Sequence, residues 1–360
     1  MKLGILGLPQ SGKTTLFQAL TRGQIEAGSS RGEKVHLGSV RVPDPRLDHL
    51  NELYHPKKFT PARVEYVDAP AVDTAGRERG ALASLTALRD VDAFVLVVRA
   101  FEDPSVAHVM GSVDATRDAS WLWGELLLED LALVERRLER IEKALKVGKQ
   151  PEDPREVEAL RAVRTALEAE KPARAAELSA AGERALRGFQ LFSMRPWIYV
   201  VNADDAELKE GEEALVRPVR ERFPFPTLHV IALSAKTEAE LTALSEAEAR
   251  EFMTVLGIEE PGLTRMIRLS YEALGLISFF TVGPDEVRAW TIHGGAAAPE
   301  AAGTIHTDLE RGFIRAEVIA YEDLRQAQTM AHARERGLLR TEGRDYRVRD
   351  GDILNIRFSV

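Results

Sequence analysis

Short, almost uninterrupted apolar runs recur along the first two thirds of the chain and predict the strands of a buried sheet. A strand that helices cover on both faces is apolar at every position, which is the pattern of a parallel sheet. A stretch of helical periodicity, Thr14–Leu20, follows the first run, and strands that alternate with helices predict a doubly wound α/β domain. The runs are Lys2–Leu6, Val64–Val67, Phe94–Val98, Trp197–Val201 and Leu228–Leu233.

A second pattern, with apolar residues three or four positions apart, fills residues 119–188 and predicts helices with one apolar side. A polar break at Lys149–Pro154 divides this segment in two. Because it lies between apolar strands, we expect a helical hairpin inserted into the α/β domain. Its two seams are Leu127, Leu131, Val134, Leu138, Ile141 and Leu145, and then Val157, Leu160, Val163 and Leu167.

Beyond residue 277 short strands and glycine-rich turns predict a small mixed α/β domain with a helical stretch at Glu322–Arg336. Its expected strands are Val287–Ile292, Arg315–Ile319, Asp345–Val348 and Ile353–Phe358. The predicted domains are therefore residues 1–118 with 189–276, an inserted hairpin at 119–188, and a C-terminal domain at 277–360.

A glycine-rich loop follows the first apolar run and indicates nucleotide binding. Residues 7–14 read GLPQSGKT and match the phosphate-loop pattern G-x-x-x-x-G-K-[ST]. The glycines let backbone N–H groups turn toward phosphate oxygens, and the helix that begins near Lys13 adds the positive end of its dipole. A chance glycine turn is the alternative, but the strand before the loop and the helix after it favour a phosphate loop. The predicted phosphate-binding residues are Gly7, Leu8, Pro9, Gln10, Ser11, Gly12, Lys13, Thr14 and Thr15.

Polar residues also follow three other apolar runs, at the strand ends where parallel sheets bind ligands. We expect Thr14 and Asp68 to hold Mg²⁺, because Asp68 ends the run VEYVD; a helix-capping aspartate is the alternative. The segments NADD and SAK follow the last two runs, where a nucleotide base would be read. The predicted base-binding residues are Asn202, Asp205, Ser234, Ala235 and Lys236.

Composition narrows the class of protein. The 360 residues suggest two or three domains, and the absence of cysteine excludes disulfide scaffolds, zinc ribbons and thiol nucleophiles. No apolar run approaches the ~20 residues of a membrane helix, so we expect a cytoplasmic protein without a membrane segment. A net charge of −9 argues against a wholly basic nucleic-acid binder, and we expect no DNA sequence specificity. A local basic stripe, Arg136, Arg140 and Lys143, is either an RNA contact or a solvated helix face.

With these residues in place, the chain resembles the YchF (Obg-like ATPase) family of translation-factor-class P-loop NTPases. The resemblance runs nearly end to end and includes GLPQSGKTTLFQALT, VPDPRLDHL at 42–50, VVRAFEDPSVAHVMGSVD at 97–114 and the stretch from FFTVGPDEVRAWTI to the end. It implies a G domain, an inserted helical hairpin and a C-terminal β-grasp (TGS) domain. It also implies Mg²⁺-dependent ATP hydrolysis, with GTP as a poorer ligand, and association with ribosomes or RNA.

Departures from the family pattern bear on hydrolysis. Asp68-Ala-Pro-Ala71 replaces the usual D-x-x-G. Val72 stands where Ras-type enzymes carry a water-orienting glutamine, but the resemblance implies an apolar residue at this position, so Val72 does not by itself exclude hydrolysis. The segment 24–39 offers no threonine that can be placed on Mg²⁺. We therefore assign no catalytic residue. Two functions stay open: an NTPase switch, and a hydrolysis-deficient nucleotide-binding adaptor.

The predicted base-binding segment NADD also differs from the family pattern. The family commonly has glutamate where this chain has Asp205, and an aspartate can accept hydrogen bonds from the N1–H and N2–H₂ groups of guanine. Ala203, however, replaces the lysine of ordinary GTPases. The residues lean toward GTP and the resemblance toward ATP, so both nucleotides stay open.

Overall fold

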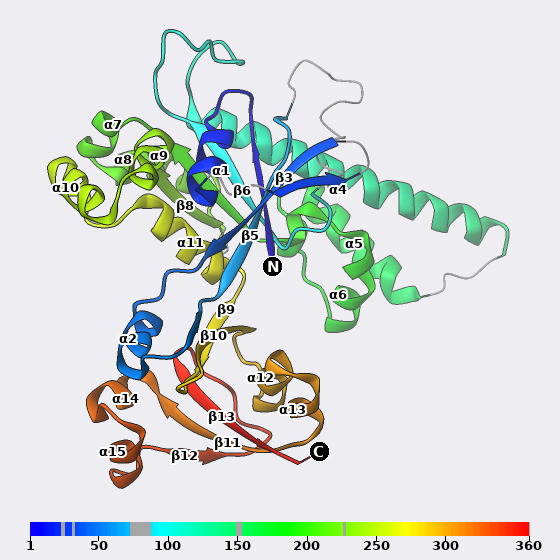
Figure 1. The fold of residues 1–360 in the computed structure, drawn as a ribbon. Helices are drawn as coiled ribbons and strands as arrows, with labels where there is room; N and C mark the ends of the chain where they lie inside the picture. Colours follow the sequence, from blue (N-terminus) through cyan, green and yellow to red (C-terminus); the bar gives the residue numbers. More distant parts are fainter. Residues whose placement is uncertain (23–25, 31–32, 73–87, 149–152, 226–227, 360) are drawn as a thin grey trace. The chain divides into compact units, whose positions relative to one another are not determined.

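The computed structural model describes residues 1–22, 26–30, 33–72, 88–148, 153–225 and 228–359 (Figure 1). The chain forms two compact units. The first comprises Met1–Gly38 and Glu65–Leu263, and the second comprises Ser39–Val64 and Thr264–Val360. None of the helices in the described part of the chain combines the length and apolar character that a membrane crossing demands.

The first unit is built on a seven-stranded sheet in the order β2-β3-β5-β1-β6-β7-β8. Neighbouring strands from β5 through β1, β6 and β7 to β8 pair in parallel, whereas β2 and β3 form an antiparallel pair. Every residue of β6 and β7 is buried, as their continuous apolar character predicts. The strands are β1 (Lys2–Gly7), β2 (Glu26–Ser30), β3 (Glu33–Arg41), β5 (Arg63–Asp68), β6 (Ala93–Arg99), β7 (Trp197–Asn202) and β8 (Leu228–Leu233).

Helices cover this sheet, and the predicted helical hairpin is present as α4 and α5 (Figure 1). The apolar seam of α4 packs with that of α5 in one cluster with the sheet's own core, although Leu145 is exposed. The helices are α1 (Lys13–Thr21), α4 (Ala115–Lys146), α5 (Pro154–Glu168), α6 (Ala180–Leu186), α7 (Asp205–Glu210), α8 (Glu212–Arg222), α9 (Ala235–Ala243) and α10 (Glu246–Leu256). Helix α11 (Gly262–Ala273) begins at the end of this unit, and its residues from Thr264 on belong to the second unit.

The second unit is built on a six-stranded sheet in the order β12-β11-β13-β9-β10-β4. Phe279, Ala302 and Val318 are among the residues of its core. The strands are β4 (Lys58–Thr60), β9 (Leu276–Thr281), β10 (Glu286–His293), β11 (Phe313–Ala320), β12 (Arg340–Glu342) and β13 (Asp352–Phe358). The helices are α2 (Pro45–Tyr54), α12 (Ala298–Ile305), α13 (Thr307–Arg311), α14 (Tyr321–Ala327) and α15 (Met330–Glu335).

One element prediction for this unit is wrong. Residues 345–348 form no strand, and only Arg347 makes an isolated bridge, with Ala297, because the segment turns around Asp352. The Asp352 carboxylate accepts hydrogen bonds from the Tyr346 hydroxyl at 2.7 Å and from Arg349 N at 2.8 Å. The predicted helical stretch at 322–336 is present as two helices, α14 and α15, because Gln328 between them adopts a left-handed conformation, with φ of 63°.

Residues 39–64 belong to the C-terminal body by their contacts. Strand β4 pairs in parallel with β10, and so adds an edge strand to the sheet that the last third of the chain forms. No apolar periodicity marks a three-residue strand, so sequence reasoning placed this segment with the G domain. The three-part division of the chain stays a prediction, and the compact units group it differently at 39–64, 119–188 and 264–276.

Candidate nucleotide-binding site

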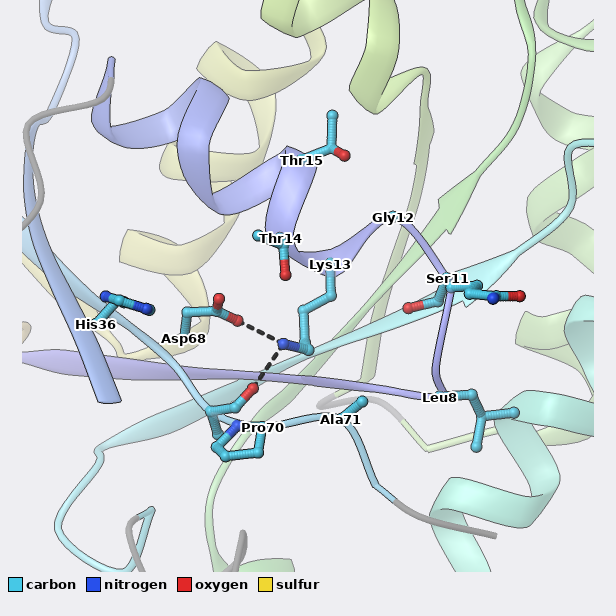
Figure 2. Close-up of a pocket in the computed structure, with 12 residues that line it drawn as sticks. Leu8, Ser11, Gly12, Lys13, Thr14, Thr15, His36, Asp68, Pro70 and Ala71 are labelled. Carbon is cyan, nitrogen blue, oxygen red and sulfur yellow. Dashed lines mark hydrogen bonds and ion pairs between the residues drawn. The ribbon is translucent and has the colours of Figure 1, made fainter. Parts of the chain in front are cut away.

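A pocket of about 490 Å³ lies where β1 leads into α1 (Figure 2). Seven of the nine predicted phosphate-binding residues line it, and Gly7 and Pro9 do not. The β5 end contributes the rest of one wall, including Asp68. The lining residues are Leu8, Gln10, Ser11, Gly12, Lys13, Thr14, Thr15, His36, Asp68, Ala69, Pro70 and Ala71.

Glycine is required at both ends of the loop that carries these residues. Gly12 precedes α1 with φ of 87°, and a Cβ added there would collide with Nδ2 of Asn202. A Cβ at Gly7 would lie 2.6 Å from Ser11 Oγ and 2.7 Å from the carbonyl oxygen of Val97. The first N–H groups of α1 have no acceptor within the helix, as in any helix, and so they can serve phosphate oxygens.

The Lys13 ammonium is the buried cation of the pocket. Its Nζ donates to Asp68 Oδ1 and to the carbonyl oxygen of Ala69, each at 2.6 Å (Figure 2). Only 8% of the lysine side chain and 7% of the aspartate side chain are exposed. An ammonium has three N–H donors, and these contacts use two of them. Because the Asp68 carboxylate pairs with the Lys13 ammonium, a buried positive charge lies at the place where the sequence predicts phosphate.

The predicted metal ligands, Thr14 and Asp68, line the same pocket from α1 and β5. Within the described residues there is no group of three or more His, Cys, Asp or Glu side chains that could hold a metal. Mg²⁺ is usually held by one or two protein oxygens together with substrate phosphates and water. One hydroxyl and one carboxylate beside a phosphate loop fit that mode of binding, and do not form a cage for a metal alone.

The predicted base-binding residues gather around Asn202, at the end of β7. Asn202 Nδ2 donates to the carbonyl oxygen of Ser11 at 2.9 Å, and its Oδ1 accepts from Ala235 N at 2.9 Å. Ser234 begins α9 as its N-cap and accepts from Thr237 N at 3.3 Å. Asn202 thus joins the phosphate loop to the turn between β8 and α9.

Asp205 and Lys236 complete the predicted base group. Asp205 is partly buried, and its Oδ1 accepts a 2.6 Å hydrogen bond from the Thr237 hydroxyl, whereas Lys236 is exposed. Neither residue lines the 490 Å³ pocket, which covers the phosphate side of the site. Sequence reasoning missed Thr237, although its position one residue after SAK was a usable signal.

Sequence reasoning also missed His36, which reaches the pocket from β3 (Figure 2). Its Nδ1 is buried and has no hydrogen-bond partner among the described residues. It lies in the segment 24–39, where no motif was found and where residues 24–25 and 31–32 are outside the described residues.

The Val72 side chain is buried and is not among the residues that line the pocket. Its side chain is 2% exposed and belongs to the core of the first unit, and its N–H donates to the carbonyl oxygen of Gly7 at 3.1 Å. Position 72 therefore has no polar side chain to offer a water molecule. Pro70 and Ala71, which stand within the altered D-x-x-G turn, do line the pocket.

A parallel sheet, a glycine loop that opens into a helix, and polar residues at the ends of β5, β7 and β8 define a P-loop NTPase fold. Comparison with known proteins gives the family. A family model named YchF-GTPase_C, "Protein of unknown function (DUF933)", matches residues 276–359. The "Ribosome-binding ATPase YchF" of Bacillus subtilis (strain 168) is 40% identical over 363 residues, which cover 99% of each chain. The "Obg-like ATPase 1" of Oryza sativa subsp. japonica is 34% identical over 379 residues, covering 100% of this chain and 92% of the relative.

A solved structure gives the same family. The "Structure of the Schizosaccharomyces pombe YchF GTPase" superposes with a TM-score of 0.83 at 33% identity, over 99% of this chain and 97% of that one. The chain belongs to the YchF (Obg-like ATPase) family. The predicted fold class, a P-loop α/β domain with an inserted helical hairpin and a C-terminal sheet domain, is confirmed.

Proposed function

We propose that this protein binds ATP or GTP with Mg²⁺ in the pocket between β1, α1 and β5, hydrolyses it, and acts as a nucleotide-dependent switch on the ribosome. The observation that carries the proposal is the buried Lys13 ammonium among the residues of a glycine-bounded loop. Relatives that match the full chain are named ribosome-binding ATPases, which supports the class of partner. Because ribosomes lie in the cytoplasm, a protein with this function would be cytoplasmic.

Each residue group has a separate task in this proposal. Backbone N–H groups of residues 7–15 and the start of α1 hold the phosphates, and Lys13 turns from Asp68 toward the β- and γ-phosphates. Thr14 and Asp68 would hold Mg²⁺, and the bound ion would supply positive charge beside the phosphates. Asn202, Asp205 and the residues Ser234–Lys236 hold the base.

A second function follows from the position of Val72. Because this side chain is in the core, the residue cannot orient a water molecule, and water must be held by backbone groups, the nucleotide or another side chain. If none of these suffices, the protein is a nucleotide-binding adaptor without turnover. The two functions share the binding site and differ only in hydrolysis.

Titration of the purified full chain with ATP and GTP in the presence of Mg²⁺ tests the site. We expect Lys13→Ala to weaken binding about tenfold or more, because a charged hydrogen-bond donor to phosphate is lost. Lys209→Ala, which removes an exposed lysine of α7, is the matched control and should bind as the wild type does. Unchanged binding by Lys13→Ala would place the nucleotide elsewhere.

Phosphate release and co-sedimentation with ribosomes separate the two functions. Turnover that Lys13→Ala abolishes, with ribosome binding that differs between di- and triphosphate, supports the switch. Tight nucleotide binding without turnover, alone or with ribosomes, supports the adaptor.

A further inference from the structure

Two aspartates follow β7, and the structure gives them different tasks. Asp204 Oδ1 accepts hydrogen bonds from Ala206 N and Glu207 N, each at 2.9 Å. The Glu207 carboxylate in turn accepts from Asp204 N at 3.1 Å, which completes a capping box at the start of α7. Asp204 therefore serves the helix.

Asp205 is held by a different partner. The Thr237 hydroxyl donates to its Oδ1 at 2.6 Å, and Thr237 is only 3% exposed. A buried threonine is restricted at χ1, so its hydroxyl fixes the direction of the carboxylate. A carboxylate offers about four lone-pair sites, so further donors can still be accepted beside the Thr237 contact.

The hydrogen bonds of Asn202 also relate the position of Asp205 to that of the phosphate loop. Asn202 bonds both to Ser11 in the loop and to Ala235 at the start of α9, and Thr237 lies two residues further along the same helix. A nucleotide whose phosphates lie in the loop extends its base toward these strand ends. Its Watson–Crick edge then meets a carboxylate whose orientation is set in advance.

We propose that Asp205, positioned by Thr237, makes guanine the preferred base, so that GTP binds more tightly than ATP. This inference rests on the proposed nucleotide site and goes beyond it by naming the base. Guanine presents N1–H and N2–H₂, two adjacent donors that an ionised aspartate can accept. Adenine presents a lone pair at N1, which would face a carboxylate oxygen and repel it. This chain would then differ in its preferred nucleotide from relatives that are named ATPases.

Calorimetry of the full chain with Mg²⁺ and the imido analogues of GTP and ATP tests the inference. We expect the GTP analogue to bind at least about tenfold more tightly, because each hydrogen bond to a charged acceptor is worth roughly that factor. Asp205→Asn should lower the affinity for the GTP analogue by about 10–100-fold. The same variant should bind xanthosine triphosphate more tightly than the wild type does, because its amide can donate to the carbonyl that xanthine carries at C2.

Variants of the neighbouring residues separate positioning from folding. Thr237→Val should lower affinity for the GTP analogue several-fold and leave the ATP analogue unchanged, and Thr237→Ser should restore it. Asp204→Asn is the matched control: it weakens the cap of α7 but should leave the ratio of GTP to ATP affinity as in the wild type.

The outcomes separate the inference from the proposed function. Binding of the ATP analogue that equals or exceeds that of the GTP analogue, and that Lys13→Ala weakens, overturns the guanine assignment alone. An Asp205→Asn variant whose ratio of GTP-analogue to ATP-analogue affinity equals that of the wild type also overturns the guanine assignment. Binding of neither analogue by the folded wild type overturns the proposed nucleotide site, and the inference with it.

Discussion

Asn202 reaches across from the end of β7 to Ser11, and its Nδ2 donates to the loop carbonyl oxygen at 2.9 Å. Its other amide atom accepts from Ala235 N, so one buried side chain ties together segments that are 191 and 33 residues away from it. The phosphate loop and the base-reading turn are therefore both hydrogen-bonded to the same amide.

Removal of that amide should loosen both segments. We expect Asn202→Ala to lower the free energy of unfolding by about 2–3 kcal/mol, because a buried carbonyl and a buried N–H lose their partner. Nucleotide affinity should fall with it. Asn355→Ala, which removes an exposed asparagine of β13, should change neither quantity measurably. Urea unfolding and nucleotide titration of both variants provide the check.

Gly12→Ala should impair binding through backbone geometry. The residue has φ of 87°, and a Cβ there collides with the amide of Asn202. We expect a loss of about 1–3 kcal/mol in stability and at least about tenfold weaker nucleotide binding. Gly124→Ala is the control, because a Cβ at that position in α4 meets no atom within 4 Å. It should stabilise the protein by about 0.5–1 kcal/mol, and equal effects of the two changes would contradict the argument.

Asp130, in the long helix α4, should make stability depend on pH. Its carboxylate is 2% exposed, and it accepts hydrogen bonds from Phe192 N and from the N–H and hydroxyl of Ser193. Burial raises the pKa of Asp130 from 3.8 to about 6, and these hydrogen bonds oppose the rise. Between these values the folded state holds a proton that the unfolded state releases, so stability falls as pH rises through this range. From well below pH 3.8 to well above pH 6 the total loss is about 3 kcal/mol.

Comparison with Asp130→Asn isolates that effect. The wild type should lose about 2.4 kcal/mol of unfolding free energy relative to this variant between pH 4 and pH 7. Glu139→Gln, on the exposed side of the same helix, should follow the wild type. If the free energy of unfolding depends on pH in the same way for the wild type and Asp130→Asn, the Asp130 carboxyl titrates in the folded protein as it does in the unfolded chain.

Arg46 should stabilise the second unit through a network of carboxylates. Its guanidinium donates to Asp44 at 2.9 and 3.0 Å and to Asp350 Oδ2 at 2.7 Å, and it lies over the Phe280 ring. We expect Arg46→Ala to cost about 2–4 kcal/mol and Arg46→Lys about half as much, because lysine cannot form the bidentate contact. The exposed pair Lys57 and Asp285 gives the control.

Lys57→Ala should cost less than about 0.5 kcal/mol, since more than 80% of each side chain in that pair is exposed. Thermal unfolding of the three variants is the measurement. A similar loss for Lys57→Ala and Arg46→Ala would show that the network around Arg46 is worth no more than a surface pair.

The sequence determined the parts of this protein that depend on local pattern. Continuous apolar runs predicted β6 and β7 because central parallel strands are buried on both faces, and a similar run predicted β8 at the edge of the sheet. The loop GLPQSGKT predicted the start of α1 because its spacing reflects backbone geometry. The apolar seams predicted α4 and α5 in the same way. Resemblance over nearly the whole chain added the family.

Contacts between distant residues were decided only by the tertiary structure. No local pattern shows that β4 pairs with β10, that His36 lines the phosphate pocket or that Lys13 pairs with Asp68. Nor does the segment NADD reveal which aspartate caps α7 and which one Thr237 holds. Each of these depends on how strands far apart in the chain are placed side by side, and that placement is a property of the packed sheet rather than of any single segment.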